Sequence, residues 1–335
     1  MDVPLEPALL LAVLQELADG RPRSRARLAA AVDLDPSELQ GALAQLADHG
    51  VREDREARLC VPGGVDLLDE TRLAMLLATR SPRPPAFELR GVTGSTNDDA
   101  RALVEAGDGD DRSPRVVLAE AQISGRGRRG RSWQSPVASN LYLTQIEALA
   151  GGAETARGLS LAVGVAVAEA LERLHGIEVA LKWPNDLLVA GRKLGGILVE
   201  LAMARGRVHA LLGVGVNVRL PAYVALGIDQ PWVDLASLGV APPARNETAA
   251  AIVSSLRETA ERFRIAGFDA TLRARWQDRD PFFGCPVEVS GGDGAVVGVA
   301  RGIDAAGELL LDTAEGRRSI GAGEVSIRLR GAALP

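Results

Sequence analysis

The chain has 335 residues, of which 47% are hydrophobic and 24% charged, and it contains 37 glycines. This composition is typical of a globular protein with room for two or three domains, rather than of a disordered chain. The net charge of -6 excludes a generally basic nucleic-acid binder, so any contact with nucleic acid has to come from a local patch.

The cysteines and histidines are few and scattered. The 2 cysteines and 3 histidines fit no redox or zinc spacing, so a disulfide framework and a zinc site are not expected. The apolar N-terminal stretch carries acidic residues and lacks a basic n-region, which indicates a helix rather than a signal peptide. Charged residues break the other apolar runs before they reach membrane-spanning length. We therefore expect a cytoplasmic protein without a membrane partner.

The first part of the chain predicts a helix-turn-helix. Three helices are expected, at 8–18, at 24–32 and from 36 to about 48. Asp35, Pro36 and Glu38 can form a capping box at the start of the third helix, which should end at Gly50. Residues 51–61 (VREDREARLCV) follow as a candidate β-wing. A winged helix-turn-helix explains this order, and an arbitrary three-helix bundle is the alternative.

The middle of the chain predicts an α/β domain. A Pro/Arg-rich stretch at 80–86 (RSPRPPA) interrupts the apolar pattern and is the best linker candidate. Strands are then expected at 87–92, 115–122, 140–147, 179–189, 193–204 and 208–218, and long helices at 155–176 and 246–268. Asn246 is expected to cap the second of these helices. The alternation indicates a mixed, hairpin-rich sheet of the α+β type.

The C-terminal region has a different texture. After Pro281 the chain consists of short apolar runs separated by glycine-containing turns. Strands of about five residues at this spacing predict a small β-barrel of roughly 50 residues. Such a unit is too short to carry much chemistry by itself.

The stretch GRGRRGRSW, residues 125–133, has the G-x-G-x-x-G spacing together with four arginines. A dinucleotide-binding turn needs a helix after its glycines, and the residues that follow contain Pro136 and no helical period. A Walker-type loop is also excluded, because no Gly-Lys-Ser/Thr follows. Arginines on a glycine-rich backbone suit a mobile clamp for an anion. A solvated basic loop is the alternative.

Two later stretches add candidate ligand groups. KWPND, residues 182–186, places a cation, an aromatic ring, an amide and a carboxylate in one strand-end turn. Lys193 begins the apolar strand KLGGILVE, so it should project from the mouth of the sheet rather than from its middle. Either lysine alone is most simply an ordinary surface lysine. Three polar clusters beside glycine on one domain indicate a ligand site.

In this order, GRGRRGRSW, SNLYL, KWPNDLL, KLGGILVE and GVGVNV resemble the biotin protein ligase family. The larger members of that family carry an N-terminal winged helix-turn-helix and a C-terminal SH3-like barrel, so the resemblance covers nearly the whole chain. It implies a winged helix-turn-helix at 1–79, a linker at 80–86, a catalytic domain at 87–279 and an SH3-like domain at 280–335.

The resemblance also implies a two-step acyl transfer. Biotin and MgATP first form biotinyl-5′-AMP and pyrophosphate, and the biotinyl group then passes to a lysine of a biotin carboxyl carrier protein. A carboxylate and an α-phosphate have to meet in the first step, and fixed cations can neutralise their repulsion. Mg²⁺ is expected to enter with ATP, without dedicated protein ligands.

The family's residue roles carry over to matching positions. The implied biotin contacts are Ser95, Thr96, Asn97, Gln122, Arg126, Gly127, Arg128 and Lys193. The implied catalytic residues are Lys182, Lys193, Arg126, Arg128 and Asp186, and the implied nucleotide contacts are Arg131, Trp133, Asn185 and Asn217. Asp186 is a candidate to orient the acceptor lysine or take its proton. Capping of a helix near Asn97 by Ser95 or Thr96, and plain core packing of Trp133, are structural alternatives.

Some members of the family are also biotin-responsive repressors, with the adenylate as corepressor and a homodimer as the DNA-binding form. The candidate recognition helix here has no Lys or Arg between Arg27 and Arg52, so it gains little phosphate attraction. The candidate contacts to operator DNA are Arg23, Arg25, Ser37 and Gln40. A ligase with a degenerate helix-turn-helix, a ligand-sensing transcription factor without catalysis, and a lipoate ligase are the alternatives.

Overall fold

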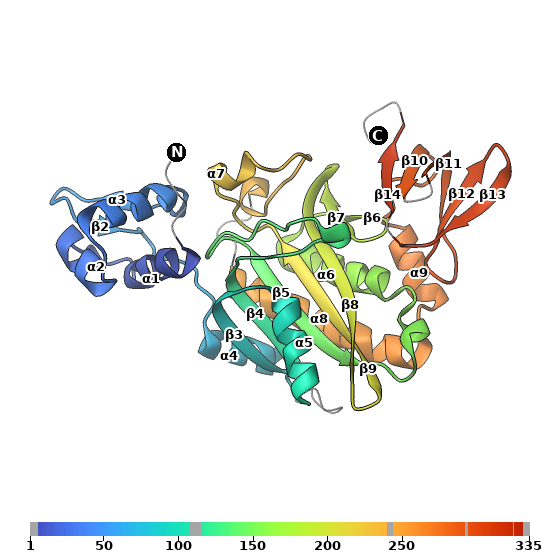
Figure 1. Ribbon diagram of the computed structural model, residues 1–335, viewed down its shortest axis with the longest axis horizontal. Coiled ribbons are helices and arrows are strands. Elements are labelled where there is room, and N and C mark those ends of the chain that lie inside the picture. The colour runs from blue at the N-terminus through green and yellow to red at the C-terminus, as the bar shows by residue number, and fades with distance from the viewer. Residues whose placement is uncertain (1–5, 108–114, 240–243, 292–293, 324, 331–335) are drawn as a thin grey trace.

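The computed structural model describes residues 6–107, 115–239, 244–291, 294–323 and 325–330. A small helical unit at the N-terminus, a large central sheet flanked by helices and a C-terminal antiparallel sheet follow one another along the longest axis (Figure 1). Within the described ranges, no helix is long and apolar enough to cross a membrane.

The N-terminal unit contains the predicted helices and two short strands. Its elements are α1 (Pro7–Leu17), α2 (Arg25–Ala31), α3 (Pro36–Gln45), the 3-10 turn η1 (Ala47–His49), β1 (Arg52–Glu53) and β2 (Leu59–Cys60). The capping box is confirmed, because Asp35 accepts from the Glu38 backbone amide and Glu38 accepts from the Asp35 amide. β1 and β2 pair antiparallel, and Gly50 ends η1 in the left-handed conformation.

Helix α4 (Glu70–Arg80) is an element that the sequence analysis did not predict. It lies within the 1–79 range, yet its buried Leu73 and Leu77 belong to the core of the central unit. It packs against α8, and Arg72 donates to Glu247 of that helix at 2.6 Å. The helical N-terminal unit and this helix therefore belong to two different cores.

The central sheet has seven strands in the order β3-β4-β5-β9-β8-β7-β6. Only β3 and β4 run parallel, and the other neighbours are antiparallel, as expected for a mixed and hairpin-rich sheet. The strands are β3 (Ala86–Thr93), β4 (Arg115–Gln122), β5 (Leu141–Ala148), β6 (Ala180–Lys182), β7 (Asp186–Val189), β8 (Arg192–Ala204) and β9 (Arg207–Val216). The stretch predicted as one strand at 179–189 is a hairpin of β6 and β7.

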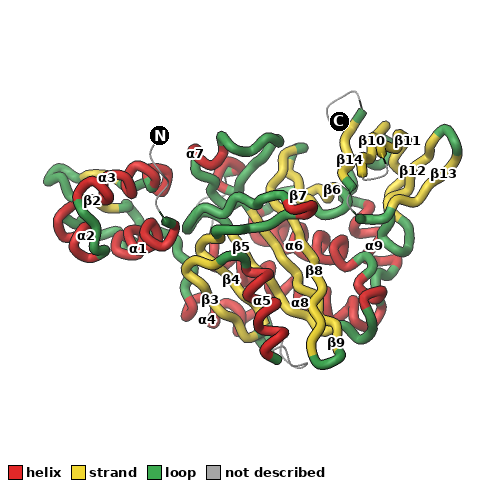
Figure 2. Tube along the Cα trace, in the orientation of Figure 1, coloured by secondary structure: helices red, strands yellow, loops and turns green. Residues whose placement is uncertain are grey.

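Helices cover both faces of this sheet (Figure 2). The front face carries α5 (Thr96–Ala106), and the back face carries α6 (Leu159–His175) and α8 (Arg245–Ala266). Helix α6 is apolar on almost every side because it is enclosed between the sheet and α8. The other elements are η2 (Arg128–Gly130), η3 (Ala153–Ala156), α7 (Ala222–Ala225), η4 (Ala236–Leu238) and α9 (Ala270–Gln277).

The predicted capping role of Asn246 is wrong. Helix α8 starts one residue earlier, with Ala244 at the cap position and no side-chain cap. The fully buried Asn246 amide instead accepts from the Asp69 backbone N–H at 2.9 Å and donates to the Leu67 carbonyl at 2.8 Å. A cap-forming residue type is used here to fasten a distant segment of the chain.

The C-terminal sheet is antiparallel, in the order β13-β12-β11-β10-β14. Its strands are β10 (Pro286–Gly291), β11 (Gly294–Ile303), β12 (Leu309–Thr313), β13 (Gly316–Ile320) and β14 (Ser326–Leu329). Its buried side chains, such as Val287 and Leu311, are continuous with the central core. The loop before β12 is fixed to the connection between β6 and β7, because the Trp183 indole donates to the Gly307 carbonyl at 3.1 Å.

Glu147 makes the stability of the folded protein depend on pH. It lines a second cavity of about 530 Å³ among apolar side chains, and burial raises its pKa from 4.5 to about 7. Because the folded state holds this proton more tightly, the stability it contributes is present below pH 4.5 and lost as the pH rises through 7. Glu147→Gln should therefore stabilise the protein at pH 8, by at most about 3 kcal/mol, and change little at pH 4. Thermal unfolding at both pH values tests this, and an equal shift at both would contradict it.

Candidate active site

A cavity of about 880 Å³ opens where the start of α5, the β6–β7 hairpin, the glycine-rich segment and the C-terminal sheet meet. Its volume is in the range of small-ligand sites in proteins. Every predicted ligase-site residue except Asn217 lines it, namely Ser95, Thr96, Asn97, Gln122, Arg126, Gly127, Arg128, Arg131, Trp133, Lys182, Asn185, Asp186 and Lys193. Sequence segments about a hundred residues apart thus meet around one space.

Part of the cavity wall is polar but uncharged. The Thr144 hydroxyl on β5 lies 2.8 Å from the Thr96 hydroxyl and 2.6 Å from Asn97 Oδ1. Gln122 Oε1 accepts from the Thr96 backbone N–H at 2.9 Å, while its Nε2 donates to Ser135. Ser95 occupies the cap position of α5 without a capping bond, and its hydroxyl has no partner among the described residues. These groups offer oriented hydrogen bonds to a neutral polar ligand.

Glycines on β9 make room for two of the lining side chains. A Cβ at Gly213 would lie 2.5 Å from Asn97 Oδ1, and one at Gly215 would lie 2.7 Å from the Trp133 ring. No side chain larger than hydrogen fits at either position without displacing its neighbour. The alternating glycines of GVGV therefore let Asn97 and Trp133 lie close to the sheet.

Lys193 connects three parts of the site. Its Nζ lies 2.7 Å from Asp186 Oδ1, with both side chains mostly buried, and 5.5 Å from the centre of the Trp133 ring. Its backbone pairs with the loop that leads to Val233, which donates to the Lys193 carbonyl at 3.0 Å. The ammonium group is consequently fixed at the cavity wall near the start of β8, as expected from the sequence.

Lys182 ends β6, which pairs with β7 on the side away from β8. Its Nζ lies 5.7 Å from the centre of the Phe282 ring, at the start of the C-terminal sheet. Burial is the main influence on its pKa and lowers it, whereas the nearby Asp186 acts in the opposite direction. Lys182 and Asp186 are register partners in the hairpin, so the KWPND turn presents both charges together.

The glycine-rich segment crosses the mouth of the cavity. No helix follows Gly130, which excludes the dinucleotide-binding arrangement, and Arg126 pairs instead with Ser132 in a short bridge. The Arg128 guanidinium donates to the backbone carbonyls of Ala322 and Gly323, which lie between β13 and β14 of the C-terminal unit. The segment therefore spans from the central sheet to the C-terminal unit.

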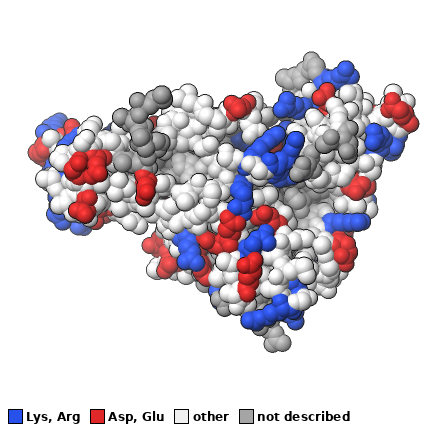
Figure 3. Space-filling view, in the orientation of Figure 1, with Lys and Arg blue, Asp and Glu red and all other residues white. Residues whose placement is uncertain are grey.

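Positive charge dominates the cavity. Its lining cations are Arg126, Arg128, Arg129, Arg131, Lys182, Lys193 and Arg328, whereas its lining carboxylates are Asp186 and Asp229. Figure 3 shows basic side chains gathered on this face of the molecule, near the place where β6, β7 and the C-terminal sheet meet. Such an excess of fixed cations favours a ligand with several negative charges.

The two asparagines assigned to the nucleotide have different positions. Asn185 lines the cavity, although its amide donates to the Ile197 carbonyl at 2.8 Å. Asn217 is buried away from the cavity lining, and its amide donates to the carbonyls of Val233 and Lys193. Asn217 therefore stabilises the backbone around Lys193.

Several lining residues escaped the sequence analysis. Phe282, Asp229 and Arg328 come from segments that carry no recognisable motif. Thr144 is fully buried beneath the polar wall, inside the predicted strand at 140–147. The hydroxyl of Thr144 within an apolar strand was the available sequence signal. Its partners, Thr96 and Asn97, could not be identified from the sequence.

The described part of the chain offers no preformed metal centre. In those ranges, no group of three or more His, Cys, Asp or Glu side chains is placed to hold a metal ion. Asp186, one of the carboxylates in the cavity, is already paired with Lys193.

The candidate DNA-contacting residues lie together on the N-terminal unit but are engaged in internal contacts. Arg25 donates to Gln40 at 3.0 Å and to Glu53 at 2.9 Å, while Arg23 pairs with Asp19. Ser37 is exposed near the start of α3. The arginine side chains are thus partly neutralised in the absence of DNA.

Two segments of the chain match known protein families. Residues 92–217 match the biotin/lipoate A/B protein ligase family. Residues 282–328 match the biotin protein ligase C-terminal domain. The two matches cover the central and the C-terminal sheets and leave the N-terminal helices outside them.

Three relatives identify the protein family more closely. The chain is 40% identical to the bifunctional ligase/repressor BirA of Salmonella typhimurium over 66% of this chain and 68% of that protein. It is 37% identical to the biotin–[acetyl-CoA-carboxylase] ligase of Mycobacterium tuberculosis over 70% of this chain and 85% of that protein. The ligase of the same name from Paracoccus denitrificans is 34% identical over 70% of this chain and 97% of its own length. The chain belongs to the biotin protein ligase family.

A solved structure supports the fold. The biotin protein ligase from Aquifex aeolicus in complex with biotin and ATP superposes with a TM-score of 0.61. It is 24% identical and covers 73% of this chain and 99% of its own. At this identity the likeness concerns the fold alone.

Proposed function

We propose that this protein is an ATP-dependent biotin protein ligase that activates biotin as biotinyl-5′-AMP and transfers it to a lysine of a biotin carboxyl carrier protein. The observation that carries the proposal is a cavity that joins a neutral polar wall to a cationic mouth. The neutral wall suits the ureido ring of biotin, and the cations suit a carboxylate next to a phosphate.

In the first step, the carboxylate of biotin attacks the α-phosphate of ATP and displaces pyrophosphate. Lys182 on β6 and Lys193 on β8 contribute fixed positive charge from the two strands that flank β7. Arginine side chains of the glycine-rich segment add charge from the mouth. Preorganised cations stabilise the charge that develops as the two anions approach. Mg²⁺ would be bound by the ATP phosphates, which agrees with a cavity poor in carboxylates.

In the second step, the acceptor lysine has to lose a proton before its amine attacks the biotinyl carbonyl and releases AMP. Asp186 is the candidate to orient this lysine or accept its proton, because it lines the cavity. The 2.7 Å ion pair with Lys193 implies that the incoming amine would compete with Lys193 for this carboxylate. The biotinyl carbonyl and the acceptor would then meet beside the KWPND turn.

Incubation with MgATP, labelled biotin and a carrier domain tests the ligase proposal. We expect label on the carrier lysine and one pyrophosphate released for each transfer. A lipoate ligase would leave the carrier without the biotin label, and a ligand-sensing transcription factor would bind biotin without releasing pyrophosphate. Either result would contradict the proposal.

We further propose that residues before α4 form a winged helix-turn-helix and that the protein is a biotin-responsive repressor. The element order α1, α2, α3 and a two-stranded wing supports the fold, and the ligase/repressor relatives support the activity. In this proposal Arg23 and Arg25 contact the phosphate backbone, while Ser37 and Gln40 contact base edges. For the rest of the chain, we propose a catalytic domain at residues 87–279 and an SH3-like barrel at residues 280–335.

Selection of random duplex DNA on the protein, with and without biotin and ATP, tests the repressor proposal. We expect enrichment of a two-fold symmetric site only with both ligands present, together with a homodimer in sedimentation. A ligase with a degenerate helix-turn-helix would retain carrier biotinylation and enrich no sequence.

A further inference from the structure

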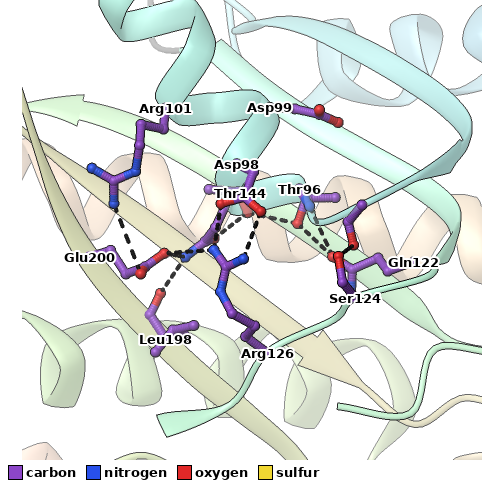
Figure 4. Close-up of polar contacts among 12 residues, drawn as sticks. Thr96, Asp98, Asp99, Arg101, Gln122, Ser124, Arg126, Thr144, Leu198 and Glu200 are labelled. Atoms are coloured by element: carbon purple, nitrogen blue, oxygen red, sulfur yellow. Dashed lines mark hydrogen bonds and ion pairs between the residues drawn. The ribbon is translucent and has the colours of Figure 1, made fainter. Parts of the chain in front are cut away.

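Arg126 of the glycine-rich segment is held by a carboxylate on α5. Its two terminal nitrogens lie 2.6 Å and 2.5 Å from the two oxygens of Asp98, a bidentate geometry (Figure 4). The same ion pair lowers the pKa of Asp98 through the hydrogen bond from Arg126. Paired donors of a planar guanidinium fix the orientation of both partners as well as their distance.

A second carboxylate connects this pair to the polar wall of the cavity. Glu200 on β8 accepts from Asn97 Nδ2 at 2.7 Å and lies 3.7 Å from Arg126 Nη2. The carbonyl oxygen of the Asn97 amide lies against Thr144. Figure 4 shows Asp98 of α5 and Glu200 of β8 both directed at the Arg126 guanidinium. The position of Arg126 is thereby linked to groups that form the proposed biotin site.

The rest of the segment has few attachments to the central unit. At its beginning, Ser124 donates to the Gly94 carbonyl at 2.9 Å. Beyond it, Arg129 and Gly130 are exposed, and Arg129 is in the left-handed conformation. The Asp98 pair is therefore the main side-chain link between the clamp arginines and the central unit, through α5.

We propose that Asp98 is a positioning residue that anchors the arginine clamp, residues 124–132, over the cavity by fixing Arg126. Asp98 does not line the cavity, so its effect reaches the ligand through Arg126. This role rests on the proposed ligase function where it concerns the adenylate. Anchoring of the clamp in the ligand-free protein does not depend on that function.

Limited trypsin digestion of the full-length, ligand-free protein tests the anchoring directly. Asp98→Asn removes the charge and leaves every arginine of the clamp in place. Both ion-pair partners are partly exposed, so we expect the pair to stabilise the clamp as much as a well-oriented surface ion pair does. Its loss corresponds to about a threefold to fivefold increase in the open population of the clamp. We expect cleavage within 124–132 to accelerate by about that factor, and Asp98→Glu to restore most of the protection.

Asp99→Asn is the matched control. Asp99 lies in the same first turn of α5, so both acids act equally on the helix dipole, but Asp99 accepts from Thr93 and makes no contact with Arg126. If Asp98→Asn and Asp99→Asn are cleaved alike, or if Asp98→Asn is cleaved no faster than the unaltered protein, the anchoring role is overturned.

Release of preformed biotinyl-adenylate in a chase experiment extends the test to function. We expect Asp98→Asn to release it about threefold to fivefold faster and to raise KM for biotin while kcat changes little. A slower release would mean that Asp98 competes with ligand for Arg126 and would overturn the proposal. If the unaltered protein forms no adenylate, the ligase proposal fails instead, and the digestion result still decides the role of Asp98.

Discussion

Lys193→Met is expected to lower the rate of biotinyl-adenylate formation by roughly 100-fold to 1000-fold, the loss typical when one preorganised group is removed from a charged transition state. Methionine keeps much of the packing against Trp133 but removes the ammonium group. It also leaves Asp186 without the partner that lies 2.7 Å away. The carboxylate then adds negative charge at the place where two anions have to meet. Pyrophosphate release in the absence of carrier measures this rate.

Arg192→Met provides the control for the Lys193 variant. Arg192 precedes Lys193 on β8, is exposed and does not line the cavity. Its replacement removes the same charge from the same strand, so any general effect of charge on the fold appears in both variants. Retention of more than about a third of the rate by Lys193→Met would contradict the role of Lys193.

Arg245→Met is expected to destabilise the protein by about 3 to 5 kcal/mol, the cost typical of leaving a buried charge without its partner. Arg245 Nη2 lies 2.7 Å from Glu120 Oε2, and the two side chains are only 3% and 5% exposed. Arg245 also donates to the Asn140 carbonyl at 3.0 Å. The pair fastens the start of α8 to β4 inside the central unit. Urea unfolding followed by tryptophan fluorescence measures the loss.

The double variant Arg245→Met, Glu120→Gln separates charge from packing. Glutamine removes the stranded charge but keeps the oxygen that accepts from the Leu68 backbone N–H at 2.6 Å. The double variant should therefore be more stable than Arg245→Met alone. If the two substitutions add their losses, the buried charge is not the cause.

Local sequence signals predicted most of the central and C-terminal strands. Apolar runs bounded by glycine and charged residues predicted the positions of most central strands to within about two residues, and Gly176 ends α6 as expected. Of the helices that were not predicted, α4 and α9 carry a recognisable N-terminal cap. Asp69 caps α4 and Asp269 caps α9 through side-chain bonds to backbone amides. Their short apolar faces made the periodic signal weak.

Contacts between distant segments explain what the sequence could not predict. Asn246 has the residue type of a cap, but its partners Leu67 and Asp69 lie in another part of the chain. The pairing of Arg126 with Asp98 likewise depends on how β4 and α5 meet. Contiguous motifs indicated which residues surround the ligand cavity. The contacts among these residues could be identified only from the three-dimensional structure.

The measurement that tests the central claim most directly separates the two half-reactions. The protein is incubated with biotin and ATP labelled in the α-phosphate, freed of small molecules, and then mixed with a carrier domain. We predict one labelled biotinyl-adenylate retained per active cavity, followed by release of labelled AMP in equal amount to the biotinylated carrier lysine. Absence of retained adenylate, or a retained adenylate that does not transfer its biotinyl group to the carrier, would contradict the account.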